Sequence, residues 1–166
     1  MQKITPCLWF DDKAEAAARF YVSVFKDSKI KIIARCTKEV SRHTGKPAGS
    51  VMTVLFKIFG QEFLALNGGP VFKISEAVSF IVNCETQKEI DRYWSKLSAA
   101  GREGQCCWLK DKFGVSWQIV PTFVGEIMGG KDSAKAERLM QAVMQMTKPD
   151  LKKMKEALKG SKRKTS

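Results

Sequence analysis

Alternating hydrophobic and polar residues mark several short strands in this chain, most clearly at residues 115–120. One face of that predicted strand is apolar and consists of Val115, Trp117 and Ile119. The other face consists of Ser116, Gln118 and Val120. Pro121 ends the strand, because proline cannot donate to a β-ladder. A strand with so few polar positions is typically buried on both faces.

The first part of the chain reads as a strand, a helix and three further strands. The predicted strands cover residues 4–10, 29–36, 50–59 and 62–66, the last two joined by a tight turn at Gly60-Gln61. The apolar face of the predicted helix consists of Ala14, Ala17, Tyr21, Val24 and Phe25. Asp11-Asp12 can cap this helix, and residues 37–49 read as a loop.

The same order recurs after Pro70. A strand at 77–83 precedes a helix that begins with the capping box Thr86-x-x-Glu89. The buried side of that helix consists of Ile90, Tyr93, Trp94 and Leu97. Gly101 is placed to follow the helix as its C′ residue. Strands at 105–109 and 115–120 come next, and their preceding connection has room for one short strand more.

This recurrence predicts an α+β fold of two βαβββ modules, at about 1–69 and 70–122, within one domain over 1–160. The helical extension, 123–160, starts a helix at Asp132 or Ser133 and restarts at Pro149-Asp150. Its apolar stripe consists of Ala136, Leu139, Met140, Val143 and Met144, which is typical of core or of a dimer contact. We expect residues 161–166 to be a basic, disordered tail.

Composition and charge narrow the classes of function. Of the 166 residues, 44% are hydrophobic, which is enough for one proper core, and no apolar run is long enough to span a membrane. The five cysteines follow no C-x-x-C spacing and read as free thiols, so we expect a cytoplasmic protein. The net charge is +12, but from Lys148 to Ser166 eight Lys or Arg stand against two acids. Nucleic-acid binding is therefore not expected to be the main function.

The polar residues on the predicted strands indicate a small-molecule site. A buried amide costs free energy unless it is paired, so Gln118 either serves local structure or faces a pocket. Aromatic residues and a few polar anchors are the usual lining of such a site. The candidate ligand-binding residues are Thr53, Asn67, Ser79, Trp108 and Gln118.

Four stretches carry a resemblance to a known family: WFDDKAEAAARFY, FLALNGGP, VSFIVNC and WLKDKFGVSWQIVP. The chain resembles the PhnB-like proteins, labelled 3-demethylubiquinone 3-methyltransferase-like, of the glyoxalase, bleomycin-resistance and extradiol-dioxygenase (vicinal oxygen chelate) superfamily. The resemblance spans about residues 4–148. It implies paired βαβββ modules that form a curved mixed sheet around a cavity, and a homodimer.

The same resemblance implies where the superfamily's enzymes hold a divalent metal. The corresponding positions are Thr5, Pro6 or Cys7 in the first strand, then Leu64 or Ala65, then Ala77, and finally Gln118 where a glutamate is usual. Only Cys7 and Gln118 could ligate, and a neutral amide is a poor replacement for a carboxylate. We therefore expect neither the superfamily's metal site nor another cofactor.

Two classes of function stay open from the sequence. The first is a binding protein that encloses a small apolar or aromatic molecule without a metal. The second is an enzyme of the same superfamily, either metal-dependent or methyltransferase-like. A methyltransferase would need a glycine-rich turn after a strand to bind the nucleotide part of its cofactor, and this sequence has no such turn. A cysteine enzyme would need His43 to reach a thiol, or a reactive residue at Cys106-Cys107, whose side chains should point to opposite faces of a strand.

Overall fold

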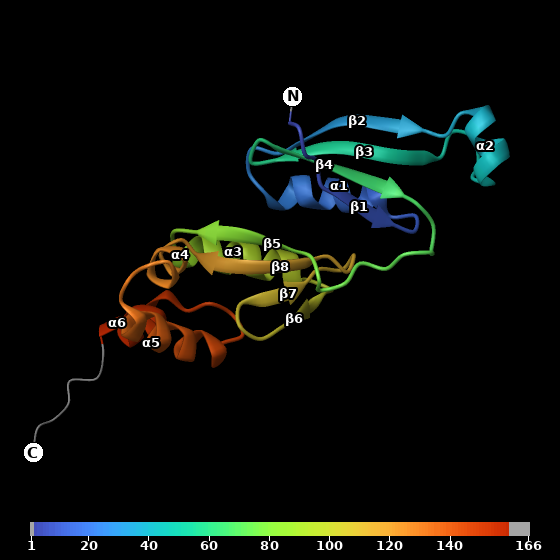
Figure 1. The fold of residues 1–166 in the computed structure, drawn as a ribbon. Helices are drawn as coiled ribbons and strands as arrows, with labels where there is room; N and C mark the ends of the chain where they lie inside the picture. Colours follow the sequence, from blue (N-terminus) through green and yellow to red (C-terminus); the bar gives the residue numbers. More distant parts are fainter. Residues whose placement is uncertain (1, 160–166) are drawn as a thin grey trace, which may run out of the picture. The chain divides into compact units, whose positions relative to one another are not determined.

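The computed structural model describes residues 2–159, and the chain divides between Ser75 and Glu76 into two compact units (Figure 1). Gly160, the last residue of the predicted helical extension, and the predicted tail at 161–166 lie outside the described residues. None of the helices within residues 2–159 is both long and apolar enough to cross a membrane.

The first unit is a four-stranded mixed sheet with one long helix against it. Its elements are β1 (Cys7–Phe10), α1 (Ala14–Val24), β2 (Lys29–Arg35), α2 (Lys38–Thr44), β3 (Val51–Ile58) and β4 (Gln61–Asn67). The strand order is β1-β4-β3-β2, in which β1 and β4 are parallel and the other pairs antiparallel. The predicted face of α1 is buried, with Tyr21 fully enclosed and stacked on Phe56 of β3.

The second unit repeats this topology and adds three helices. Its elements are β5 (Ser79–Cys84), α3 (Gln87–Ser98), β6 (Arg102–Glu103), β7 (Trp108–Lys110), β8 (Ser116–Pro121), α4 (Phe123–Met128), α5 (Ser133–Met144) and α6 (Leu151–Lys159). The strand order is β5-β8-β7-β6, with β5 and β8 parallel. The predicted α+β class, with mixed sheets and C-terminal helices, is confirmed, and both sheets are open rather than closed.

The start of α1 differs from the prediction. Neither Asp11 nor Asp12 caps the helix; instead Oδ1 of Asn67, at the end of β4, accepts a 2.8 Å hydrogen bond from the backbone N of Ala14. The side-chain Nδ2 of Asn67 donates to the carbonyl of Val51 at 2.9 Å. The last strand of the sheet therefore supplies the cap, and sequence spacing could not show a partner so distant along the chain.

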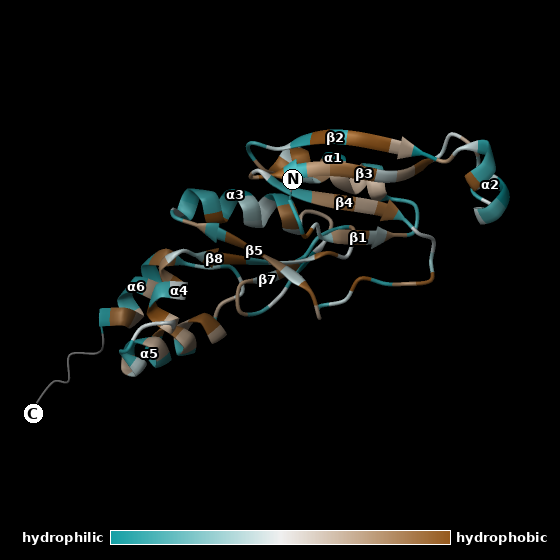
Figure 2. Cartoon of the chain, turned by 45° about the horizontal axis from the view of Figure 1, so that its top comes forward, coloured by the Kyte–Doolittle hydropathy of each residue, from teal (hydrophilic) through white to brown (hydrophobic). Residues whose placement is uncertain are grey.

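The segment predicted as a loop at 37–49 contains the short helix α2. Thr37 caps it through a hydrogen bond from the N of Val40, and Gly45 ends it with φ 71°. None of its residues is buried, and Figure 2 shows it as mostly hydrophilic. Without an apolar face it lacks the periodicity on which the helix prediction depends.

Helix α3 forms as predicted, with both hydrogen bonds of the Thr86–Glu89 capping box present and the predicted face buried. Gly101, however, is not the C′ residue, because Ala99 is the C-cap and Ala100 takes the left-handed φ of 57°. A Cβ at Gly101 would lie 2.1 Å from the carbonyl oxygen of Lys110. Glycine is needed there because the backbone between β7 and β8 passes too closely for a side chain.

Cys106 and Cys107 form a turn rather than a strand. Both have left-handed backbones, with φ 56° and 69°. The N–H of Cys106 donates to the carbonyl of Met146 at 2.8 Å, and that of Cys107 to Thr147 at 3.1 Å. The prediction that the two side chains point to opposite faces of a strand is therefore wrong, because neither residue has a strand backbone. The two backbone N–H groups instead bind the connection between α5 and α6.

The C-terminal helices form a small core of their own against this turn. Asp132 caps α5 as predicted, and Leu139 and Met154 are fully buried together with Cys107. Not all of the predicted stripe is buried in this core: Met140 is 38% exposed and Met144 is 59% exposed. The helices are thus part of the second unit and leave methionine on its surface.

Candidate ligand site on the second sheet

Three of the five predicted site residues meet on one face of the β5-β8-β7-β6 sheet. Trp117 and Ile119 of β8 are buried on the face that α3 covers, so the alternation places Ser116 and Gln118 on the opposite face. Gln118 lies directly across from Trp108 of β7. Its Nε2 donates a 2.8 Å hydrogen bond to the hydroxyl of Ser79 on β5. One face of three adjacent strands therefore carries an indole, an amide and a hydroxyl.

The contacts of Gln118 bear on whether its amide serves local structure or faces a pocket. The amide is half-buried, and its nitrogen is paired with a side chain rather than with a backbone group. Within residues 2–159 its Oε1 accepts no hydrogen bond, which leaves an acceptor on the same face as Trp108.

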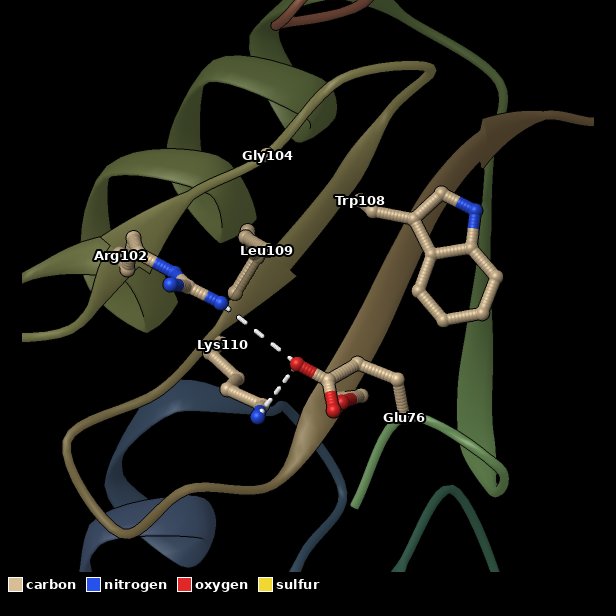
Figure 3. Close-up of a pocket in the computed structure, with 7 residues that line it drawn as sticks. Glu76, Arg102, Gly104, Trp108, Leu109 and Lys110 are labelled. Carbon is tan, nitrogen blue, oxygen red and sulfur yellow. Dashed lines mark hydrogen bonds and ion pairs between the residues drawn. The ribbon is translucent and has the colours of Figure 1, made fainter.

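A hollow of ≈ 100 Å³ lies beside these residues (Figure 3). It is lined by Glu76, Arg102, Gly104, Trp108, Leu109, Lys110 and Ser116. Ser116 is 1% exposed, and among the described residues its hydroxyl has no hydrogen-bond partner. A buried hydroxyl without a partner costs free energy, so a water molecule or a ligand atom that enters the hollow would gain by pairing with it.

Charged side chains form one rim of the hollow. The carboxylate Oε1 of Glu76 lies 2.5 Å from Nζ of Lys110 and 3.5 Å from a terminal nitrogen of Arg102. Figure 3 shows both cationic ends pointing toward this carboxylate. The hydrogen bond from Lys110 holds the pKa of Glu76 below its usual value, so Glu76 is an anion at neutral pH.

Thr53 and Asn67 lie in the other unit. Thr53 is half-buried in β3, opposite Leu66 of β4. Asn67 lines a second, more open hollow of ≈ 510 Å³. Its side-chain amide is already hydrogen-bonded to the backbone of Ala14 and Val51. Its backbone carbonyl accepts a hydrogen bond from Nζ of Lys46.

The positions implied for a metal hold weak ligands. Cys7 lies next to Leu64 on paired strands, Ala65 is buried, and Ala77 precedes β5. Partial burial raises the pKa of the Cys7 thiol, which disfavours the thiolate that would bind a metal. Gln118 offers a single neutral oxygen. Among the described residues no three His, Cys, Asp or Glu side chains gather closely enough to hold an ion.

Among residues 2–159, His43 makes no hydrogen bond to a cysteine thiol. His43 is exposed on α2 in the first unit, whereas Cys84 and Cys107 are buried in the second. Burial raises the pKa of both of those thiols to about 12, so they stay protonated at neutral pH. Neither is an activated nucleophile.

Comparison with solved structures identifies the class of fold. The PhnB protein of Bacillus cereus is 35% identical, with a TM-score of 0.65, and the match covers 73% of this chain and 100% of that one. Protein PA1353 of Pseudomonas aeruginosa is 16% identical, covering 73% and 98%, with a TM-score of 0.57. The fosfomycin resistance protein FosX of Listeria monocytogenes is 12% identical, covering 75% and 94%, with a TM-score of 0.52. These are glyoxalase-like folds of the vicinal oxygen chelate superfamily.

The family follows from the sequence match. A family model described as 3-demethylubiquinone-9 3-methyltransferase matches residues 2–120, so the chain belongs to that PhnB-like family. The helices α4 to α6 lie beyond the matched region. Comparison with curated proteins gives no match.

Of the residues that line the hollow, only Trp108 was among the predicted site residues. The polar ones that the prediction missed are Glu76, Arg102, Lys110 and Ser116. Ser116 could have been found, because it alternates with Gln118 on the same strand face. Lys110 lies opposite Ser116 in the ladder, and Arg102 lies opposite Lys110. Finding the two cations required the register of three strands, which hydrophobic patterning alone does not determine.

Proposed function

We propose that this protein binds a small aromatic molecule on the open face of the second sheet, without a divalent metal. The observation that carries the proposal is the meeting of Ser79, Trp108 and Gln118 from three strands beside a hollow. An indole supplies apolar contact area, and the few polar groups around it would orient a ligand.

The metal-free part of the proposal rests on the donors at the implied positions. A thiol that favours its protonated form and one amide oxygen are a poor set for a hard divalent cation, which prefers several charged or carbonyl oxygens. The reaction of a superfamily metalloenzyme is therefore not the function that we favour.

Methyl transfer is the second candidate, because the matching family model carries that description. A doubly wound methyltransferase would bind its nucleotide cofactor at the end of a parallel sheet with a glycine-rich turn. Each sheet here has one parallel pair at its edge, which favours the binding function. Calorimetric titration with S-adenosylmethionine tests the alternative, and saturable binding would favour it over the binding function.

The test of the proposed function compares two glutamine-to-leucine variants. A library of small aromatic compounds is titrated against chelator-treated protein, with binding followed by calorimetry. Gln118→Leu should weaken the best binder by about 1–2 kcal/mol, because one polar contact is lost. Gln141→Leu, on the exposed side of α5, is the matched control and should leave affinity unchanged.

Two results would overturn the proposal. If Gln118→Leu lowers stability but leaves affinity unchanged, the amide serves only the sheet. If binding or turnover disappears with the chelator and returns with one divalent metal, the protein is a metalloenzyme of its superfamily.

We also propose a homodimer, as the resemblance implies. The exposed Met140 and Met144 of α5, with Met128 of α4 at 44% exposure, support it, because such apolar area is commonly covered by a partner. Light scattering at micromolar concentration should give twice the chain mass, and a monomer would contradict the proposal.

A further inference from the structure

The ion pair at the rim of the hollow can be replaced at little cost. Glu76 is 55% exposed and Arg102 is 75% exposed, whereas Lys110 is only 24% exposed. Exposed ion pairs contribute little to stability, because water and salt screen them. The Glu76 carboxylate is therefore a weakly held occupant beside a more firmly placed ammonium group.

A second observation points to a ligand at the same place. Ser116, directly opposite Lys110 on the neighbouring strand, buries a hydroxyl that no group of the described chain satisfies. An oxygen atom of a ligand in the hollow would accept that hydroxyl's hydrogen bond. The ammonium group of Lys110 and the hydroxyl of Ser116 thus present two donors on one face of the sheet.

The third component is the indole of Trp108, which lines the hollow and is half-buried. Its ring offers a flat apolar surface beside the two donors. The hollow, of ≈ 100 Å³, is smaller than the ~150 Å³ cavity that encloses a benzene molecule, so it can hold at most one aromatic ring, with part of the ligand in solvent. Cations, a hydroxyl donor and an indole together match a ligand with a ring at one end and a carboxylate at the other.

We propose that the hollow between Trp108, Lys110 and Ser116 binds a monocyclic aromatic carboxylate, whose carboxylate group displaces that of Glu76. This inference rests on the proposed function and names the class of its ligand. Glu76 then acts as an internal competitor: it keeps the two cations paired when the ligand is absent, and it lowers the apparent affinity when the ligand is present.

The test uses benzoate, its neutral analogue benzamide and inorganic phosphate, each titrated calorimetrically into the full chain at neutral pH. Benzoate should bind at least about five-fold more tightly than benzamide, as expected for one charge-assisted contact. Phosphate, which has no ring, should bind more weakly than benzoate. Lys110→Gln should remove the preference for benzoate over benzamide.

If Glu76 competes with the ligand, removing its charge should strengthen benzoate binding, whereas removing the charge of Lys110 weakens it. Glu76→Gln should tighten benzoate binding about three- to ten-fold, because the ligand no longer displaces an anion, and should leave benzamide unchanged. Glu126→Gln on α4 and Lys88→Gln on α3, both exposed, are the matched controls and should change neither affinity.

Ser116→Ala separates a ligand contact from a structural role. It should weaken benzoate binding about five-fold without lowering the melting temperature, because the hydroxyl has no partner to lose. A lower melting temperature with unchanged affinity would overturn the inference.

The remaining outcomes distinguish the inference from the proposed function. Equal binding of benzoate and benzamide, weakened by Gln118→Leu, would refute the carboxylate class and leave the aromatic-binding function standing. Tighter binding of phosphate than of benzoate would refute the aromatic class. No change with Glu76→Gln would refute the competition. Failure of both ring compounds, and of the wider aromatic library, to bind would refute both proposals.

Discussion

The indole Nε1 of Trp117 donates a 2.8 Å hydrogen bond to Oδ2 of Asp111, a carboxylate on a residue that is only 3% exposed. The other oxygen, Oδ1, accepts from the backbone N of Phe113 at 2.8 Å and of Val115 at 3.1 Å. One buried carboxylate therefore fixes both the turn after β7 and the start of β8. The stretch KDKFGVSW, which is part of one of the four stretches that carry the family resemblance, thus has a structural role: it shapes the hairpin that carries Ser116 and Gln118.

Asp111→Asn should reduce the free energy of unfolding by about 1–3 kcal/mol. The asparagine side chain keeps one oxygen, which can still accept from the backbone N–H groups of Phe113 and Val115. Its NH2 group would then face the indole N–H of Trp117, and two donors cannot form a hydrogen bond. Urea unfolding followed by circular dichroism measures the change. Asp12→Asn, at a side chain 68% exposed, is the control and should stay within about 0.5 kcal/mol of the parent. Equal effects of the two substitutions would contradict the role of Asp111.

Two glycine-to-alanine changes should act in opposite directions. At Gly101 the new methyl group would lie 2.1 Å from the carbonyl oxygen of Lys110, and backbone cannot yield cheaply, so we expect a loss of about 1–3 kcal/mol. At Gly125, inside α4, no atom lies within 4 Å of the added methyl group, and alanine should gain up to about 1 kcal/mol through helix propensity. Thermal unfolding of both variants tests the pair, and a stable Gly101→Ala protein would show that this backbone approach is looser than described.

Asn67→Ala should destabilise the first unit by about 1–2 kcal/mol, because the cap of α1 and the bond to Val51 are both lost. Asn83→Ala, at an exposed position of β5, is the control and should have little effect. Affinity for an aromatic ligand, measured on the same proteins, decides whether Asn67 also contacts it. Reduced affinity without reduced stability would favour the predicted ligand role over the cap.

The raised pKa values of Cys84 and Cys107 predict slow alkylation and a loss of stability at high pH. Burial keeps both thiols protonated up to about pH 12, whereas in the unfolded chain they ionise near pH 9. Their contribution to stability is therefore complete below pH 9 and falls as the pH rises from 9 to about 12. Iodoacetamide at pH 8, followed by mass spectrometry, should leave both unmodified in the native protein and modify both in urea. Modification of either thiol in the native protein as fast as in urea would contradict the burial.

Local signals in the sequence predicted much of the fold. The Thr86–Glu89 capping box and the apolar face of α3 are set by neighbouring residues, and both formed as predicted. The alternation along 115–120 correctly assigned the faces of β8. Such features depend on interactions within one turn of helix or one strand, where spacing alone determines the geometry.

Features that depend on distant partners were missed. The cap of α1 comes from Asn67, and the requirement for Gly101 comes from the backbone of Lys110. The left-handed turn at Cys106-Cys107 is fixed by bonds to the helical extension, which no local pattern indicates. The candidate site shows the same limit. Ser116 was visible on its strand, whereas its neighbours at the hollow required a register between strands.

Each unit begins with a strand whose partner is the last strand of that unit. In the first unit Cys7 pairs with Leu64, so β1 has no place in a sheet until β4 has been synthesised. The antiparallel strands β2, β3 and β4 are local in sequence and can associate first, since short loops close at less entropic cost. We therefore expect the N-terminal strand to add last, both on the ribosome and in refolding. Kinetic experiments should find the β1 backbone amides becoming protected from hydrogen exchange after those of the β3–β4 hairpin.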